Sequence, residues 1–252
     1  MIIQLAMRNR AQPLALFSLM GIASRIAQRL GVHRDGLALE LSPFQTEERR
    51  RIWWQLEHIE LLISQLVGCI PMTLYADWDS KMPASIEDED MDREIRSIPR
   101  DRTGLTSMSH CLWRYDILET HRKLRRATPD AGWITSKHFS PADRLGLIEM
   151  HRSTLAEKYL QYCEPVEPSH LWIQIGIQSF VAALQRAARQ PGITSIKISD
   201  LSTEDRDAFL KACVKCMEYY VLAQTTPSIA GFRWHNECYF QWATCKWPCC
   251  SP

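Results

Sequence analysis

The sequence is short of several features that would assign a function at once. It has no apolar run of the roughly 18 to 20 residues that a membrane-spanning helix needs. Strand-like alternation is confined to residues 193–198. No glycine-rich phosphate loop, nucleophile elbow or His-Glu-x-x-His motif is present. The first cysteine is Cys69, so no thiolate cluster can precede it. These absences argue against a membrane protein and against the common nucleotide- and zinc-dependent enzymes.

The charge is nearly balanced, with 30 Lys and Arg against 29 Asp and Glu. A protein that binds DNA through phosphate contacts is usually clearly basic, so autonomous DNA binding is disfavoured. The two short basic clusters, at 49–51 and 122–126, lie on expected helices and are interpreted as solvated faces or internal ion-pair partners. Nine cysteines without a regular framework favour reduced thiols in the cytosol or nucleus.

What the 252 residues do contain is helix signals, and they predict an all-α fold. Gly31 is expected to end the first helix, and Ser42 with Gln45 to cap the second. Thr106, Ser140 with Asp143, and Ser202 with Asp205 are expected to begin later helices. The expected buried face of the first helix is Leu16, Leu19, Met20, Ala23, Ile26, Ala27 and Leu30. That of the second is Ile52, Leu56, Ile59, Ile63 and Leu66, ending at Gly68. Leu145, Ile148, Leu155 and Tyr159 are expected to face inward from the helix after Ser140.

We therefore predict a single domain of about seven or eight packed helices, with one long, irregular and exposed loop at about 72–105. The domain is expected to cover residues 1–242, and residues 243–252 to form an irregular cysteine-rich tail.

The stretch from Gly21 to Pro71 resembles the middle regulatory region of fungal transcription factors of the zinc binuclear cluster type. The resemblance rests on the order of an LGVHRD-like helix end, an SPF cap and an RRRIWW helix. The signature residues are Arg25, His33, Arg34, Asp35, Arg50, Arg51, Trp53 and Trp54. The resemblance implies a nuclear protein that regulates transcription, with secondary-metabolite gene clusters as candidate targets.

Two departures from the family pattern shape the expected partners. The six-cysteine zinc module that contacts DNA in this family is missing ahead of the resemblance, so we expect no cofactor in this chain and zinc only in that absent module. The tail after Trp242 suggests a truncated chain, which would be cytoplasmic. We expect protein partners, such as a full-length relative or a second copy, a small hydrophobic effector, only indirect contact with DNA, and no membrane.

The signature residue Asp35 follows an expected helix end, and its position predicts a structural role. We expect it to pair with an arginine of the 49–51 run and so fix two helices, while Trp53 and Trp54 fill the seam. His33 is interpreted as part of the same helix-end packing. No catalytic residue is assigned.

Other motifs leave alternatives open. Cys213 and Cys216 form a Cys-x-x-Cys pair that fits either two core residues or a metal or redox site. Asp77 and Asp79, and Glu167 with His170, are weak candidates for acid-base or metal chemistry. The alternative functions are an enzyme or carrier for a hydrophobic metabolite, such as a cyclase or dehydratase, and a non-functional gene fragment.

Overall fold

The computed structural model describes residues 12–67, 69, 77–127, 140–189 and 202–237. Within these ranges it contains seven α-helices, several short 3₁₀ segments and no strand, so the all-α prediction is confirmed. None of the described helices combines the length and the apolar character that a membrane span requires. The chain divides into two compact units, residues 1–127 and 128–252. The boundary at residue 242 stays a prediction, because the tail lies outside the described residues, as do Gly68 and 193–198.

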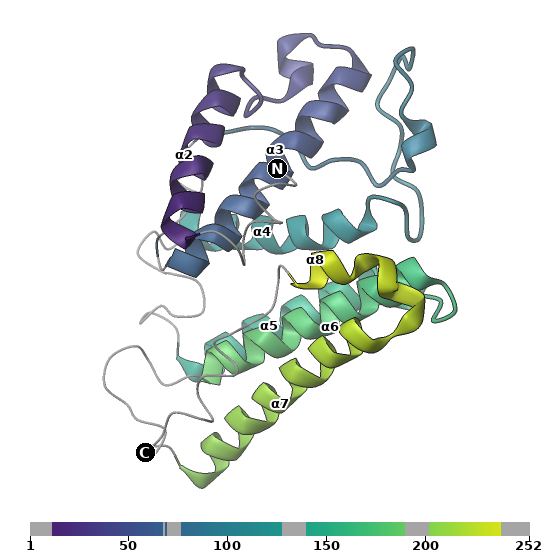
Figure 1. Ribbon diagram of the computed structural model, residues 1–252. Coiled ribbons are helices and arrows are strands. Elements are labelled where there is room, and N and C mark those ends of the chain that lie inside the picture. Colours follow the sequence, from purple (N-terminus) through teal and green to yellow (C-terminus); the bar gives the residue numbers. More distant parts are fainter. Residues whose placement is uncertain (1–11, 68, 70–76, 128–139, 190–201, 238–252) are drawn as a thin grey trace. The chain divides into compact units, whose positions relative to one another are not determined.

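The first unit is built around helix α3, Pro43–Val67. Helix α2, Pro13–Arg29, and helix α4, Ser109–Ala127, both pack against α3. The short 3₁₀ segment η1, Gly36–Leu39, lies between α2 and α3 and also contacts α3 (Figure 1). Between α3 and α4, residues 77–108 contain only the 3₁₀ turn η3, Asp88–Asp90.

The second unit centres on helix α6, Pro168–Arg189, which packs against α5, Pro141–Lys158, and α7, Thr203–Thr225 (Figure 1). Its smaller elements are η4, Leu160–Tyr162, η6, Pro227–Phe232, and α8, Arg233–Glu237. Phe232 lies parallel to Trp172 of α6, with ring centroids 4.1 Å apart. This stack fixes the end of the described chain on the central helix of the unit.

The predicted caps at Gly31, Ser42, Ser140 and Ser202 form as expected because they depend only on neighbouring residues. Thr106 differs: α4 begins three residues later, at Ser109, and the Thr106 amide donates to the Ser109 hydroxyl at 2.7 Å. Gly31 has φ 68°, and its amide donates to the Gln28 carbonyl at 2.9 Å while the Val32 amide donates to Ala27 at 2.9 Å. This is the Schellman arrangement that glycine favours at a helix end. The Ser42 hydroxyl accepts from the Gln45 amide at 3.2 Å and starts α3.

Ser140 and Ser202 cap α5 and α7 in the same way.

The predicted buried faces are only partly right. In α2, Leu16, Met20 and Ala27 are buried, but Leu19, Ile26 and Leu30 are exposed. The error arises because α2 is apolar around more of its circumference than α3 can cover. Two further predictions fail: Ile52 lies on an exposed strip of α3 beside Gln45 and Glu48, and Leu145 lies on the outer side of α5.

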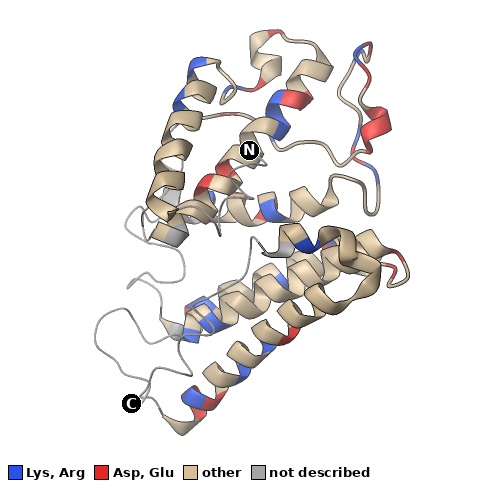
Figure 2. Cartoon of the chain, in the orientation of Figure 1, with Lys and Arg blue, Asp and Glu red and all other residues tan. Residues whose placement is uncertain are grey.

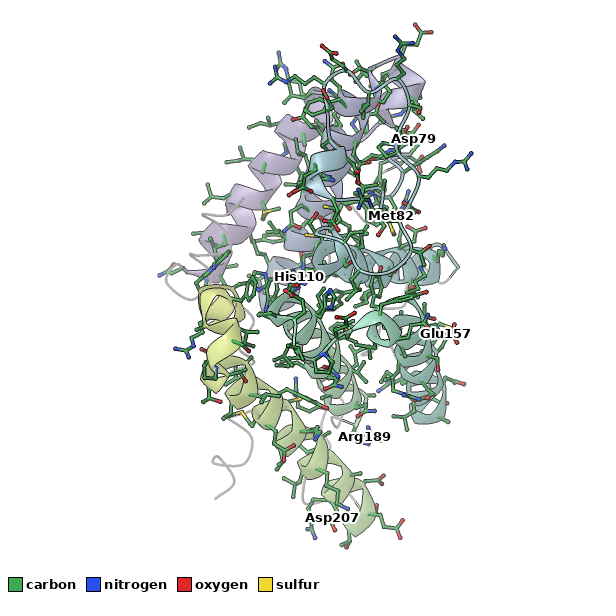
Figure 3. The ribbon with its side chains drawn as sticks, turned by 90° about the vertical axis from the view of Figure 1, so that its right-hand side faces the viewer. Asp79, Met82, His110, Glu157, Arg189 and Asp207 are labelled. Atoms are coloured by element: carbon green, nitrogen blue, oxygen red, sulfur yellow. The ribbon has the colours of Figure 1, made fainter. Side chains whose placement is uncertain are left out.

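The long loop is irregular, as predicted, but it is not exposed throughout. Trp78, Ser80, Ala84 and Ile86 are all buried. We call residues 78–84 the strap, because this extended segment is bonded to the first unit at several points. Asp79 and Met82 mark the strap in Figure 3.

Candidate functional site

The family-signature residues other than Arg25 lie where the strap crosses the first turns of α3. Asp35 caps the amino end of η1, its side chain accepting a hydrogen bond from the Leu37 amide at 3.2 Å. The next residue, Gly36, has no room for a side chain, because a Cβ there would lie 2.5 Å from Thr46 Oγ1 and 2.8 Å from Thr46 Cα. This close approach brings Asp35 against α3 one turn from Arg50.

Asp35 and Arg50 form a buried two-point ion pair. Arg50 Nε donates to Asp35 Oδ2 at 2.8 Å, and Arg50 Nη2 donates to Oδ1 at 2.9 Å. Both side chains are 6% exposed. The Lys81 amide of the strap also donates to Oδ2 at 2.9 Å. The predicted pairing of Asp35 with the arginine run is therefore present, and the planar guanidinium meets the carboxylate in its preferred geometry.

The pKa of Asp35 reflects two opposing effects. Burial alone would raise it, but the hydrogen bonds from Arg50, Lys81 and Leu37 favour the ionised form more strongly and lower the pKa below its usual value of 3.8. The carboxylate is therefore charged at neutral pH and holds η1, α3 and the strap together.

The neighbouring arginines contact two other segments. Arg49 Nη2 donates to the Leu30 carbonyl at the end of α2, at 2.6 Å. Arg51 bonds Glu47 at 3.2 Å and Asp88 of η3 at 2.9 Å. The three adjacent arginines therefore bond α2, η1 and η3 within the same unit. We call Asp35, Glu47, Arg50 and Arg51 the charged joint; Figure 2 shows acidic and basic residues side by side on α3.

Glu47 is the most deeply buried acid of the charged joint. Its carboxylate, which is 0% exposed, accepts from the Ala84 amide of the strap at 3.2 Å. Burial raises its pKa above the usual 4.5, although Ala84 and Arg51 oppose this shift. Glu47 therefore binds the far end of the strap. It has fewer hydrogen-bonding partners than Asp35, so burial raises the pKa of Glu47, whereas the partners of Asp35 lower the pKa of that residue.

Trp53 and Trp54 of α3, Trp78 of the strap and Tyr115 of α4 form an aromatic cluster. Trp78 of the strap meets Trp53 and Trp54 edge-on, at centroid distances of 5.8 and 5.3 Å. Trp54 also lies 5.7 Å from Tyr115 of α4, and its Nε1 donates to the Lys81 carbonyl at 2.8 Å. The two signature tryptophans thus pack against the strap and α4, and not only in the seam between two helices.

Arg122 of α4 closes the other side of Trp78. Its guanidinium carbon lies 3.3 Å from the centre of the Trp78 ring, and its Nη2 donates to the Trp78 carbonyl at 2.6 Å. This cation–π contact is buried, where such interactions are strongest. The basic cluster on α4 therefore also contributes to internal packing through Arg122.

The remaining signature residues lie at the edge of the charged joint or outside it. Arg34 pairs with Asp79 through a more exposed bridge of 3.1 Å, with side chains 52% and 45% exposed. The His33 carbonyl accepts from the Asp79 and Ser80 amides at 3.2 and 3.3 Å, and its ring lies 5.9 Å from Trp53. Arg25 is exposed on α2, outside the charged joint.

Sequence reasoning missed Trp78, Glu47 and Arg122 as parts of this site. No role is assigned to Trp78 or Glu47 from the sequence, and Arg122 is treated there only as part of a basic cluster on a helix. Glu47 bonds Ala84, 37 residues away, and Arg122 bonds Trp78, 44 residues away, so no local spacing pattern reports these contacts. A tryptophan between two acids in a polar segment was the one available signal, since such a large apolar side chain requires a buried partner surface.

The other candidate motifs show core or capping roles in the structure. Cys213 and Cys216 are buried on the face of α7 toward α6, and Cys216 packs with Ala182 and Ala183. Burial raises the pKa of Cys216 to about 11, which leaves it mostly protonated at neutral pH. His170 Nδ1 accepts from the Glu164 amide at 3.2 Å. Within the described ranges, no three His, Cys, Asp or Glu residues gather as a metal site.

Residues 1–144 match the fungal specific transcription factor domain, which is more than half of the chain. The chain belongs to this family. The match includes all eight signature residues and confirms the resemblance drawn from the sequence.

Three curated relatives extend the match beyond residue 144. The aurofusarin cluster transcription factor aurR2 of Gibberella zeae is 30% identical over 95% of this chain and 36% of its own length. The transcriptional regulator AacuB of Aspergillus aculeatus is 27% identical over 91% of this chain and 31% of its own. The pyriculol/pyriculariol biosynthesis cluster transcription factor 1 of Pyricularia oryzae is 26% identical over 92% and 33%. The chain spans about a third of each relative, and no solved structure matches it.

Proposed function

We propose that this chain is the helical regulatory domain of a zinc cluster transcription factor that controls a biosynthetic gene cluster. The observation that carries the proposal is the family match over residues 1–144 together with relatives named as cluster transcription factors. The relatives are named as regulators, which supports this proposal, and nothing in the comparisons favours the metabolite-enzyme or gene-fragment alternatives.

The geometry of the charged joint supports indirect contact with DNA. Arg49, Arg50 and Arg51 donate to groups of their own unit, so this basic run is occupied by internal partners and is not displayed for phosphate. DNA contact and zinc binding are then tasks of the six-cysteine module that this family carries. The proposed location is the nucleus, and the proposed partners are proteins, including a full-length relative.

The strap offers a physical route for regulation by a hydrophobic effector. A ligand that binds better to one packing of the strap than to another would shift the population between them in proportion to that difference in affinity. The strap suits this role because it is held by discrete hydrogen bonds and not by a repeating ladder: its amides donate to Asp35 and Glu47, and it accepts from Trp54.

The test replaces the chromosomal gene with a deletion, the wild-type sequence, Asp35→Ala or Arg34→Ala, and measures transcripts and metabolites together. We expect deletion to change one coherent set of biosynthetic genes, which wild type and Arg34→Ala restore. Asp35→Ala should fail to restore them, because it unlocks the buried pair, whereas Arg34→Ala removes only the exposed one. Immunoblots check that each variant accumulates. Unchanged transcripts with an accumulating intermediate would favour the enzyme alternative and refute the proposal.

A further inference from the structure

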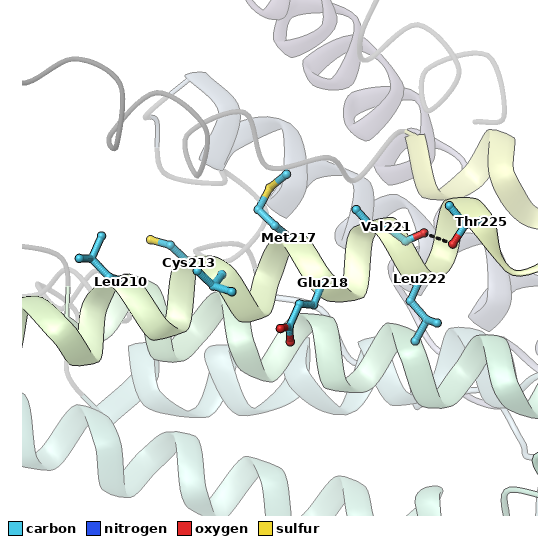
Figure 4. Close-up of a pocket in the computed structure, with 8 residues that line it drawn as sticks. Leu210, Cys213, Met217, Glu218, Val221, Leu222 and Thr225 are labelled. Atoms are coloured by element: carbon cyan, nitrogen blue, oxygen red, sulfur yellow. Dashed lines mark hydrogen bonds between the residues drawn. The ribbon is translucent and has the colours of Figure 1, made fainter.

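Helix α7 carries a second apolar stripe in addition to the one that packs on α6. Its core face is formed by Phe209, Ala212, Cys213, Cys216 and Ala223, which are buried. The second stripe consists of Leu210, Val214, Met217 and Val221. Leu210, Val214 and Val221 are 40%, 57% and 51% exposed. These residues line an open groove of about 590 Å³ along the helix (Figure 4).

The spacing of the second stripe is four, three, four, which is the spacing of the a and d positions of a heptad repeat. Val214 and Val221 take the a positions, and Leu210 and Met217 the d positions. Continuing the repeat in either direction reaches Asp207 and Gln224, which are polar. The second stripe is therefore two heptads long and is bounded by a polar residue at each end. This is expected of a surface that pairs with one helix of matching length.

Charges beside the second stripe favour a second copy of α7 running antiparallel. In this register Leu210 of one copy lies opposite Val221 of the other, and Val214 opposite Met217, which gives four apolar layers. The flanking e positions are Lys211 and Glu218, both exposed, and Glu218 also forms an exposed ion pair with Lys215 of its own helix at 3.0 Å. Antiparallel pairing brings Lys211 of each copy next to Glu218 of the other, so opposite charges meet twice across the twofold axis.

The parallel arrangement lacks this complementarity. In a parallel pair, each g position of one helix faces the e position of the following heptad in the other helix. Arg206 would therefore lie against Lys211 of the second copy. Like charges at this position oppose pairing. Both acidic and basic residues lie along α7 in Figure 2, but only the antiparallel register matches them.

We propose that α7 forms an antiparallel pair with α7 of a second copy of this chain, through Leu210, Val214, Met217 and Val221 and two contacts between Lys211 and Glu218. The inference does not rest on the proposed function, because it concerns association of the purified chain. Four layers make a small interface, so the dissociation constant should be on the order of 1 to 100 μM.

The experiment is sedimentation equilibrium of the full chain from about 1 to about 200 μM, a range that brackets this dissociation constant. It is run in low salt with a reductant, because Cys69 is exposed and could cross-link. We expect a reversible monomer–dimer equilibrium. Val214→Glu should abolish it, whereas Val166→Glu, at a side chain 93% exposed outside α7, should leave it unchanged. A wild-type chain that stays monomeric throughout the range would overturn the proposal.

Exchanging charges tests the register without touching the second stripe. Lys211→Glu alone and Glu218→Lys alone each place like charges opposite one another, and each should raise the dissociation constant about tenfold. An equimolar mixture of these two variants restores both opposite-charge contacts and should form heterodimers at wild-type affinity. Circular dichroism confirms that each variant folds. If the mixture associates no better than either variant alone, the antiparallel register is wrong.

Discussion

Removing the Asp35 carboxylate should destabilise the first unit more than any other single loss of charge described above. Asp35→Ala leaves the Arg50 guanidinium buried without its carboxylate, and breaking one side of a buried pair costs roughly 3 to 5 kcal/mol. The Lys81 and Leu37 amides also lose their acceptor, which adds to the cost. Because a domain is stable by only about 5 to 15 kcal/mol, a large part of the stability would be lost.

The assay is urea unfolding followed by tryptophan fluorescence, since Trp54 donates to the carbonyl of Lys81, whose amide bonds Asp35. Arg34→Ala is the matched control. It removes the neighbouring bridge to Asp79, which is about half exposed and should contribute only about 0 to 1 kcal/mol. If Asp35→Ala lowers the free energy of unfolding by less than about 0.5 kcal/mol, the buried-pair argument fails.

A double-mutant cycle and a pH series separate the ion pair from general packing. Asp35→Ala combined with Arg50→Ala should cost clearly less than the sum of the single variants, because no charge is then left unpaired. The lowered pKa of Asp35 means that its contribution is present above its unfolded pKa and is lost as pH falls through the folded pKa, below 3.8. The stability difference between wild type and Asp35→Ala should therefore shrink in that acidic range.

Three further predictions test separate features. Gly36→Ala should destabilise by about 1 to 3 kcal/mol in a urea melt, since its Cβ would lie 2.8 Å from the α3 backbone. Gly146→Ala, in the middle of α5 with no atom near the added Cβ, should instead stabilise by about 0.5 to 1 kcal/mol. Glu47 has a raised pKa, so its stabilising contribution is present at low pH and lost as pH rises through the folded pKa. Glu47→Gln should therefore gain stability relative to wild type as the pH rises above 4.5, and a constant difference would contradict this. Iodoacetamide followed by peptide mapping should label exposed Cys69 in the native chain but buried Cys216 only after unfolding.

The sequence reveals the helices and their caps more accurately than it reveals which faces are covered. A cap such as Ser42 with Gln45 involves residues three apart, so its outcome does not depend on the rest of the fold. Leu19 and Ile26 fit an apolar period equally well as Leu16 and Met20, yet only the latter pair meets α3. Periodicity establishes that a helix has apolar surface, but the packing of distant elements decides how much of it is buried.

The strap shows the same limit in a stronger form. Its residues have no period, which correctly predicts irregular backbone but says nothing of burial. The Lys81 and Ala84 amides donate hydrogen bonds to the carboxylates of Asp35 and Glu47, which precede them by 46 and 37 residues. A segment without regular structure can be buried only where side chains elsewhere in the chain supply such partners. Its position therefore follows from the charged joint and not from its own sequence.

Helix geometry explains why the three adjacent arginines bond different segments. Successive residues of an α-helix are turned by about 100°, so neighbours in sequence point to different sides. Arg49, Arg50 and Arg51 accordingly reach the end of α2, η1 and η3, three segments that precede or follow α3. A cluster that looks in sequence like a basic patch thus connects separate segments around one turn of helix. Replacing Arg50 by Lys should keep the charge but lose the two-point contact with Asp35, so urea stability should fall even though the net charge is unchanged. A lysine variant as stable as wild type would show that charge alone, and not the fork of the guanidinium, holds the charged joint.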